Sequence, residues 1–280
     1  MRSVRAWAAA AVLAVLPPTA GLGNDLPACG GEDVCTIEAG SYHVRAPDGW
    51  DGEAPLGVFL FFHGFRSSGL SAVRSGSLQE VFGGAGYLIV APNGDEWQEG
   101  ARAWPARDAP GRPWRDDVAF TRAVLADVAQ RFPVDDARVV IAGFSAGGSM
   151  AWRVACRQAD GLAAVISIAG ALRRPVPEAC GGGPVPALQI HGYSDRTVPL
   201  EGRRIRDWHQ GDVFETLDLI RRANGCESLP AAVETEGRYW CRDWTGCGSG
   251  APVGFCLHPG GHGLPADWTT LARDWLASLG

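Results

Sequence analysis

The segment VVIAGFSAGGSM, residues 139–150, constrains the fold more than any other part of the chain. Four apolar residues, all but one β-branched, predict a strand, and the residues after Ser145 predict a helix. A strand that turns directly into a helix holds the residue between them at a sparsely populated backbone angle. Its neighbours two positions away must then be nearly free of side chain, which Gly143 and Gly147 are. The pattern predicts that Ser145 is a nucleophile at a sheet edge, although the same letters also occur by chance.

Apolar runs alternate with helix-like segments from about residue 55 to the C-terminus. Continuous apolar strands indicate a parallel sheet that is covered on both faces, and the alternation predicts a doubly wound α/β fold. No repeat or low-complexity linker divides the chain, so we expect one catalytic domain over residues 24–280. The predicted strands are residues 56–62, 87–91, 139–142, 163–169 and 187–190, and the predicted helices are residues 116–132, 213–226 and 266–279.

Residues 1–23 have the pattern of a secretory signal peptide. Two arginines precede an apolar stretch that is too short to span a bilayer, and small residues lead to an expected cleavage between Ala20 and Asn24. We therefore expect a secreted protein, extracellular or periplasmic, without a membrane anchor after cleavage. The net charge of −6 gives no basic surface for nucleic acid, and nothing indicates an obligate protein partner.

Eight cysteines in an exported chain indicate four disulfides rather than metal ligands. The chain has no CxxC pair and no HExxH motif, so we expect no metal site. Two pairs are favoured by position, since two cysteines lie close together near the mature N-terminus and two others flank a glycine-rich turn. These two pairs are Cys29–Cys35 and Cys241–Cys256, and among the four remaining cysteines we favour Cys156–Cys180 and Cys226–Cys247.

A serine nucleophile needs a general base, and a carboxylate must orient that base. In α/β-hydrolases the acid and then the histidine follow the serine along the chain, which leaves four of the six histidines. His191 ends a predicted strand and is expected to pack behind the site, and His209 lies in a charged segment. His258 is expected to be held in the sheet. His262 follows two glycines on a loop, so it is favoured as the base.

The acid and the oxyanion donors are expected at the same sheet edge. Asp195 lies a few residues beyond the strand at residues 187–190, where α/β folds place catalytic groups. Asp207 and Asp212 lie farther on and are interpreted as solvated charges. The backbone N–H groups of Ala146 and of Phe65, in the HGF motif after the first predicted strand, are the candidate oxyanion donors.

The segment of residues 93–115 is a long connection with little periodicity, three prolines and three tryptophans. Loops of this length in compact domains are usually functional or disordered, and tryptophans argue against disorder. We predict that Trp97 and Trp104 contact substrate. Trp114 abuts the next predicted helix and is expected to pack beneath it. The alternative is that these tryptophans form part of the core.

Six motifs are carried together by this chain: HGF, DDVAF, VDDARVVIAGFSAGGSMAWRVAC, HGYSDRTVP, ANGC and GGHGLP. Together they resemble the esterase family of polyhydroxybutyrate depolymerases and bacterial feruloyl esterases, over nearly all of the mature chain. The resemblance implies an α/β-hydrolase that cleaves carboxylic esters without a cofactor. It also implies a triad of Ser145, Asp195 and His262, with Phe65 and Ala146 as oxyanion donors. The family carries an aromatic residue two positions after the histidine, so the leucine of GGHGLP is expected to alter the pocket wall.

These observations predict a secreted serine esterase that works through an acyl-enzyme. The expected substrates are hydroxyalkanoate esters of the polyhydroxybutyrate type, or feruloyl or acyl-carbohydrate esters. One alternative is a secreted peptidase, because the same constellation cleaves amides. Another is a binding protein that keeps only the fold, but such proteins usually lose a triad member and none is missing here.

Overall fold

A computed structural model describes residues 29–98, 100–106, 114–206 and 208–280. The predicted signal peptide, residues 1–23, lies outside these ranges, and so does the expected start of the catalytic domain at residue 24. Within the described ranges, no helix combines the length and the apolar character that a membrane span requires.

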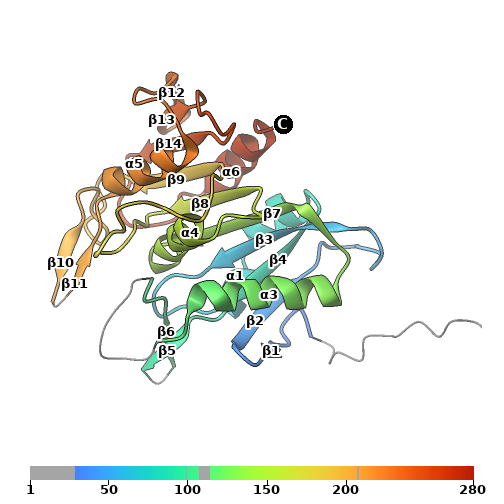
Figure 1. Ribbon diagram of the computed structural model, residues 1–280. Helices are drawn as coiled ribbons and strands as arrows, with labels where there is room; N and C mark the ends of the chain where they lie inside the picture. Colours follow the sequence, from blue (N-terminus) through green and yellow to red (C-terminus); the bar gives the residue numbers. More distant parts are fainter. Residues whose placement is uncertain (1–28, 99, 107–113, 207) are drawn as a thin grey trace, which may run out of the picture.

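A ten-stranded sheet forms the centre of the described chain, in the order β1-β2-β4-β3-β7-β8-β9-β14-β13-β12 (Figure 1). The six strands from β4 to β14 in this order are parallel. Antiparallel pairs extend both edges. The strands are β1 (Cys35–Ile37), β2 (Gly40–Arg45), β3 (Leu56–Phe62), β4 (Tyr87–Pro92), β7 (Val134–Phe144), β8 (Ala164–Ile168), β9 (Ala187–Gly192), β12 (Ala232–Glu236), β13 (Tyr239–Trp244) and β14 (Val253–His258).

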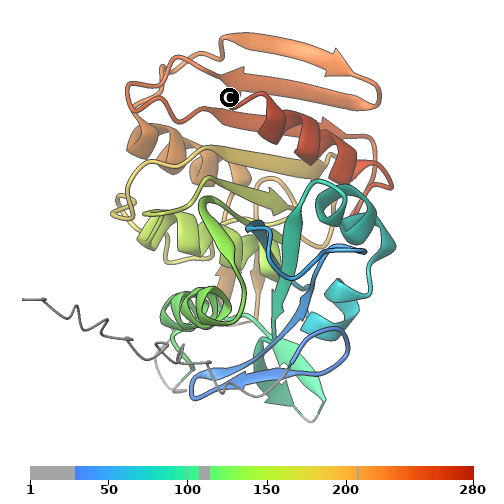
Figure 2. The same ribbon diagram turned by 90° about the vertical axis from the view of Figure 1, so that its right-hand side faces the viewer.

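Helices cover both faces of this sheet (Figures 1 and 2). Helices α3 (Asp117–Arg131), α4 (Ala146–Arg157) and α5 (Val213–Asn224) contribute buried side chains to one hydrophobic core. A second core lies under α1 (Gly69–Val73), α2 (Gly76–Leu78), the π-helical turn η1 (Gln79–Gly83) and α6 (Trp268–Ala277). The two cores explain why the central strands are apolar on both faces, and they confirm the predicted doubly wound α/β architecture.

The predicted core strands agree closely with the structure, except at the start of β7. β3 and β8 are buried at every residue, as their continuous apolar sequences predict. β7 begins at Val134, five residues before the predicted start, because Val134 pairs with Leu56 of β3. Three of the four intervening residues are charged and all four are at least partly exposed, so hydrophobicity alone does not reveal that they belong to a strand.

The strand order reverses between β3 and β7. From β3 the chain moves outward to β4, and it later crosses back to β7 and continues through β8 and β9 toward the other edge. In open α/β sheets, ligands bind beyond the carboxyl ends of the strands at such a reversal. The loop after β3 carries His63, Gly64 and Phe65, and the turn after β7 carries Ser145. Topology therefore brings the HGF motif and the predicted nucleophile to one crevice.

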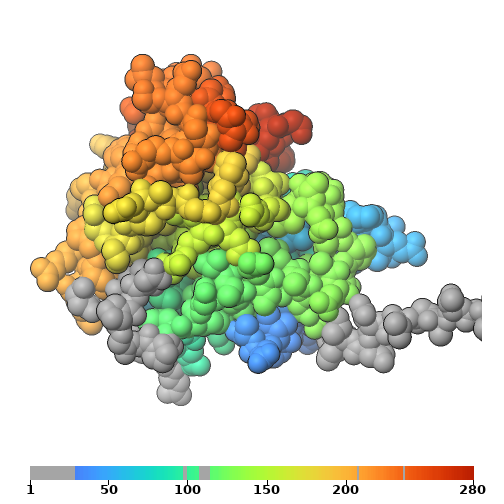
Figure 3. Space-filling model, viewed as in Figure 1, coloured from blue at the N-terminus to red at the C-terminus, as the bar shows by residue number. Residues whose placement is uncertain are grey.

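Two short hairpins lie on the same side of the molecule (Figure 1). The first, β5 (Asp95–Gln98) with β6 (Ala101–Ala103), falls inside the segment that the sequence predicts to be an aperiodic connection. The second is β10 (Arg203–Ile205) with β11 (Trp208–Gln210). It appears in orange at the left of the space-filling view (Figure 3). These strands are too short to show a clear period in the sequence.

Four disulfides join Cys29 to Cys35, Cys156 to Cys180, Cys226 to Cys247 and Cys241 to Cys256. They are the pairs that cysteine positions in the sequence favour, and no cysteine in the described chain is free. Cys241 and Cys256 are direct partners in the antiparallel strands β13 and β14. This disulfide thus cross-links two strands near the C-terminal edge of the sheet.

Candidate active site

Ser145 lies at the turn between β7 and α4 with a positive φ of 57° and a ψ of −117°. Its N–H donates to the carbonyl of Ile168 at 2.8 Å, which ties the turn to β8. A Cβ on Gly143 would lie 2.3 Å from the carbonyl oxygen of Gly147, and one on Gly147 would lie 2.0 Å from that of Phe62. Only glycine avoids these overlaps, so the two glycines are what allow the strained serine to stand at the sheet edge.

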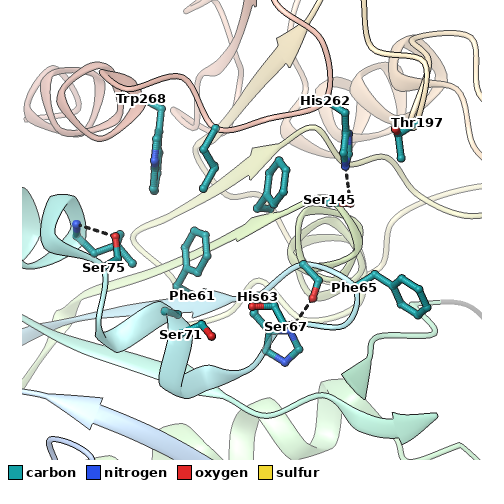
Figure 4. Close-up of a pocket in the computed structure, with 15 residues that line it drawn as sticks. Phe61, His63, Phe65, Ser67, Ser71, Ser75, Ser145, Thr197, His262 and Trp268 are labelled. Carbon is teal, nitrogen blue, oxygen red and sulfur yellow. Dashed lines mark hydrogen bonds between the residues drawn. The ribbon is translucent and has the colours of Figure 1, made fainter. Parts of the chain in front are cut away.

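His262 connects Ser145 to Asp195 through two hydrogen bonds. The distance from Ser145 Oγ to His262 Nε2 is 2.9 Å, and the distance from His262 Nδ1 to Asp195 Oδ2 is 2.7 Å (Figure 4). If Nδ1–H donates to the carboxylate, Nε2 is free to accept the serine proton. The three predicted residues, which lie on three separate segments after β7, β9 and β14, are thus brought together.

Asp195 is held as a carboxylate by its surroundings. Its Oδ1 accepts the backbone N–H groups of Thr197 and Val198, each at 2.8 Å, while Oδ2 faces His262. Burial alone would raise the pKa of Asp195, but the hydrogen bonds from His262, Val198 and Thr197 outweigh it and the pKa is lowered. The group is therefore negatively charged at neutral pH and can orient the imidazole.

A buried polar chain supports the loop that carries Asp195. Trp152 Nε1 donates to Gln189 Oε1 at 2.6 Å, and Gln189 Nε2 lies 2.8 Å from His191 Nδ1. His191 Nε2–H then donates to the carbonyl of Val198 at 2.8 Å. Burial lowers the pKa of His191, so the ring is neutral. His191 therefore packs behind the site and fixes the loop.

His258 and His209 have other surroundings. His258 ends β14 and is buried, and its Nδ1 accepts the N–H of Gly260 at 3.1 Å. Burial, with the charge of Arg238 as a smaller cause, lowers the pKa of His258. His209 lies in β11 and its Nδ1 contacts the carbonyl of Gln210. Of the histidines that follow Ser145, only His262 has a hydrogen bond to it in the described chain.

Two cavities meet at Ser145, and both are also lined by Phe65 and Thr197. The first has a volume of about 540 Å³ and is called the aromatic pocket. Its walls include Phe61, Phe144, Leu264 and Trp268, together with serines of the α1 region (Figure 4). The second, of about 510 Å³, is called the arginine groove and is lined by Arg66, Arg173, Arg203 and Arg206, among others.

The candidate oxyanion donors flank the serine. Ala146 is the first residue of α4, and the first N–H groups of a helix have no partner within it. Phe65 follows Gly64 in the HGF loop, with its side chain 49% exposed. Both residues line the arginine groove next to Ser145. Sequence analysis did not identify Thr197 or the rings of the aromatic pocket as parts of the site, because these residues lie in separate segments that only folding brings together.

His63 holds the HGF loop in place. Its Nδ1–H donates to the carbonyl of Gly64 at 2.8 Å, its Nε2 accepts the N–H of Gly94 at 3.0 Å, and its carbonyl accepts Nε1–H of Trp104 at 2.9 Å. Burial lowers the pKa of His63 to about 4, even though the contact with Gly64 raises it. The neutral ring therefore connects this loop to the segment after β4.

The three tryptophans of residues 93–115 have different surroundings in the structure. Trp104 borders the arginine groove, but it has no exposed surface and belongs to the core, as the alternative interpretation of these tryptophans expects, so its contact with substrate stays a prediction. It supports the loop of His63 from behind. Trp114, expected beneath the helix, lines the arginine groove. Trp97 lies in β5, but its side chain is outside the described part of the structure, so its role stays a prediction.

We expect His63→Gln to weaken the acid sensitivity of folding. Because the pKa of His63 is lower in the folded state than its usual 6.5, the unfolded chain binds the proton first as the pH falls. Stability is therefore lost between about pH 6.5 and 4, by up to ~3 kcal/mol from this residue. Glutamine keeps a donor and an acceptor without the titration. Urea unfolding of both proteins at pH 7 and 4.5 measures the difference.

The difference between variant and wild type is the relevant quantity for this test. Burial raises the pKa of Asp117 to about 6, so this group titrates over the same range with the opposite effect on stability. Asp117 is present in both proteins and its contribution cancels. An equal loss of stability on acidification in both proteins would contradict the assignment to His63.

Comparisons with known proteins agree with this fold and class of chemistry. The family described as phospholipase/carboxylesterase matches residues 119–207. The probable feruloyl esterase C of Aspergillus niger is 29% identical to this chain, over 90% of this chain and 88% of its own length. Feruloyl esterase C of Emericella nidulans is 28% identical, over 86% of this chain and 84% of its own length. The solved acetyl xylan esterase from Aspergillus awamori has a TM-score of 0.64 at 14% identity, over 85% of this chain and 94% of that one. The predicted α/β-hydrolase fold and the resemblance to feruloyl esterases are confirmed.

Proposed function

We propose that this chain, a carboxylic ester hydrolase of the α/β-hydrolase fold similar to feruloyl esterases, is an exported serine esterase that acts through Ser145, His262 and Asp195. One observation carries the proposal. The hydrogen-bond distances of 2.9 Å and 2.7 Å link a strained serine, a loop histidine and a buried carboxylate at the reversal of strand order. This arrangement is what nucleophilic catalysis by a serine requires.

The reaction proceeds in two halves. Ser145 Oγ attacks the ester carbonyl while His262 Nε2 takes the hydroxyl proton, and the N–H groups of Phe65 and Ala146 stabilise the oxyanion. His262 then gives the proton to the leaving alcohol, which leaves an acyl group on Ser145. A water molecule attacks this acyl-enzyme with His262 again as the base, and the acid and the free serine result.

Asp195 acts on the orientation and charge of His262. Its lowered pKa means that the carboxylate remains ionised while the imidazole gains a proton. The negative charge 2.7 Å from Nδ1 stabilises the imidazolium that forms in each half-reaction. Because Thr197 and Val198 also hold this carboxylate, it stays in place when the ring changes its charge.

The aromatic pocket favours an aromatic acyl group. Phe61, Phe144 and Trp268 line the cavity that Ser145 and His262 also line, with the Phe144 ring 5.1 Å from that of His262, and rings of this kind pack well against a phenyl ring (Figure 4). The names of the relatives point the same way. We therefore propose feruloyl and related acyl-carbohydrate esters as substrates. Hydroxyalkanoate esters are the second substrate class, on the resemblance of the motifs alone.

Export is supported by the four disulfides, which persist in oxidising compartments, and by the signal-peptide pattern of residues 1–23.

Release of ferulate tests the proposed function. Methyl ferulate and a feruloylated arabino-oligosaccharide should be cleaved with a kcat/KM of at least ~10⁴ M⁻¹ s⁻¹, within the range of enzymes acting on their own substrates. A trimer of 3-hydroxybutyrate and a peptide anilide serve as comparisons and should be cleaved far more slowly. Preference for the trimer would assign the enzyme to polyester hydrolysis. No cleavage of any ester would contradict the proposal.

A further inference from the structure

The turn that leads to His262 contains two consecutive glycines, Gly260 and Gly261. Glycine has more conformational freedom than any other residue, so this sequence does not fix the path of the turn by itself. A catalytic side chain, however, must be held within about 0.5 Å of its productive position. Contacts from outside the turn therefore have to hold His262 beside Ser145.

The backbone of Gly260 is held on both sides. Its N–H donates to Nδ1 of His258 at 3.1 Å, and its carbonyl accepts the N–H of Ser194 at 3.0 Å. Because Ser194 precedes Asp195, the second bond joins the turn to the loop of the catalytic acid. Of these two bonds, the one to His258 is made by a side chain, so the identity of that residue decides whether it forms.

Gly260 fits closely against the ring of His258. A Cβ on Gly260 would lie 2.7 Å from both Cε1 and Nδ1 of the ring, which is too close for a carbon atom. The next position differs. For a Cβ on Gly261, the nearest described atom outside its chain neighbours is the carbonyl oxygen of Ser194, at 3.8 Å. The ring of His258 thus limits where the chain at Gly260 can lie.

His258 also has a feature that fold stability does not explain. The residue is only 4% exposed, and burial, with the charge of Arg238 as a smaller cause, lowers its pKa and keeps the ring neutral. Because Nδ1 accepts the N–H of Gly260, the proton of the neutral ring is on Nε2. Nε2 is buried and has no hydrogen-bond partner among the described residues. An apolar side chain would avoid the free-energy cost of this buried donor.

We propose that His258 is a positioning residue of the esterase reaction, which holds the turn before His262 in place through the N–H of Gly260. The inference rests on the proposed function. His258 is not among the described residues that line the aromatic pocket or the arginine groove. Its loss should therefore lower kcat and leave KM nearly unchanged.

Two amide variants test which ring nitrogen matters. The side-chain carbonyl of asparagine can take the place of Nδ1, whereas the longer glutamine puts its amide near the place of Nε2. For methyl ferulate, His258→Gln should lower kcat by about 10- to 100-fold, because misplacing a catalytic group by about 1 Å costs up to ~10²-fold. His258→Asn should keep at least about half of the wild-type kcat, and KM should change by less than about twofold in both variants.

His258→Leu separates positioning from support of the fold. Leucine removes the unpartnered Nε2–H, and the N–H of Gly260, a partly exposed residue, can bind water instead. We expect a Tm within about 3 °C of the wild type together with a loss of kcat of about 10- to 100-fold. A fluorophosphonate should label Ser145 of this variant more slowly by a similar factor, since labelling also requires the base.

Alanine at each glycine of the turn forms a second matched pair. Gly260→Ala places a methyl group against the ring of His258 and should lower kcat about tenfold or more. Gly261→Ala adds the same group one residue later, where it meets an ordinary contact, and should lower kcat less than about twofold.

The outcomes separate the inference from the proposed function. If the wild type does not cleave methyl ferulate or any other ester, the proposed function is wrong, and the rate of fluorophosphonate labelling still compares the variants. The inference fails if His258→Leu keeps the wild-type kcat and labelling rate, or if His258→Gln is as active as His258→Asn. It also fails if the variants raise KM at unchanged kcat, or if Gly261→Ala is as damaging as Gly260→Ala.

Discussion

Ser145→Ala is expected to lower kcat for ester hydrolysis by a factor on the order of 10⁶, because no other described side chain occupies the nucleophile position. The variant should fold normally. Within the described residues the Ser145 side chain has a hydrogen bond only to His262, and the backbone bond to Ile168 does not depend on the hydroxyl. Hydrolysis of methyl ferulate measures the loss of activity, and thermal unfolding checks the fold. A fluorophosphonate probe should label the wild type at Ser145 and leave the variant unlabelled.

The neighbouring histidines provide the control for this experiment. His262→Asn should lose activity to a similar extent, since members of a triad act as a unit. His258→Asn should keep most of it, because the described side-chain contacts of His258 are with Gly260 and Tyr239 and not with Ser145. If Ser145→Ala retained more than about 1% of wild-type turnover, where ~10⁻⁶ is expected, the nucleophile would have to lie elsewhere.

Trp104→Ala is expected to lower the free energy of unfolding by about 3–5 kcal/mol, as truncation of a fully buried tryptophan usually does. Its ring packs edge-on against Phe62 at 4.9 Å and near His63 at 5.2 Å, and its Nε1–H donates to the carbonyl of His63. Removal leaves a cavity and an unpaired carbonyl beneath the HGF loop. Urea unfolding at neutral pH measures the change.

Activity of Trp104→Ala should fall similarly for all esters, because the loop that carries Phe65 loses its support. Trp240→Ala is the matched control. Its side chain is 48% exposed and contacts Tyr193 edge-on at 6.4 Å, so we expect a loss of stability below about 1.5 kcal/mol. Near-native stability of Trp104→Ala together with a selective loss of bulky substrates would instead support a direct contact of Trp104 with substrate.

Local sequence patterns determined the central part of the fold. β3, β8 and β9 are mainly apolar segments, buried at every residue, that a doubly covered sheet accommodates, and α3 and α5 begin at aspartate caps, Asp116 and Asp212. The turn at Ser145 is also local, since Gly143 and Gly147 are required by atoms a few residues away or in the adjacent strand. Chain order and strand ends were enough to single out the three residues that the structure joins by hydrogen bonds.

Tertiary structure decided what no local pattern contains. The burial of Trp104 depends on Phe62 and His63, about forty residues earlier in the chain, and its sequence surroundings resemble those of an exposed loop. The edge strands and short hairpins have too few residues to show a period, so their pairing is decided by partners across the sheet. The arginine groove exists only because the loops after β3 and β8 and the β10–β11 hairpin converge. Its arginines are close together in the folded chain although they belong to separate segments of the sequence.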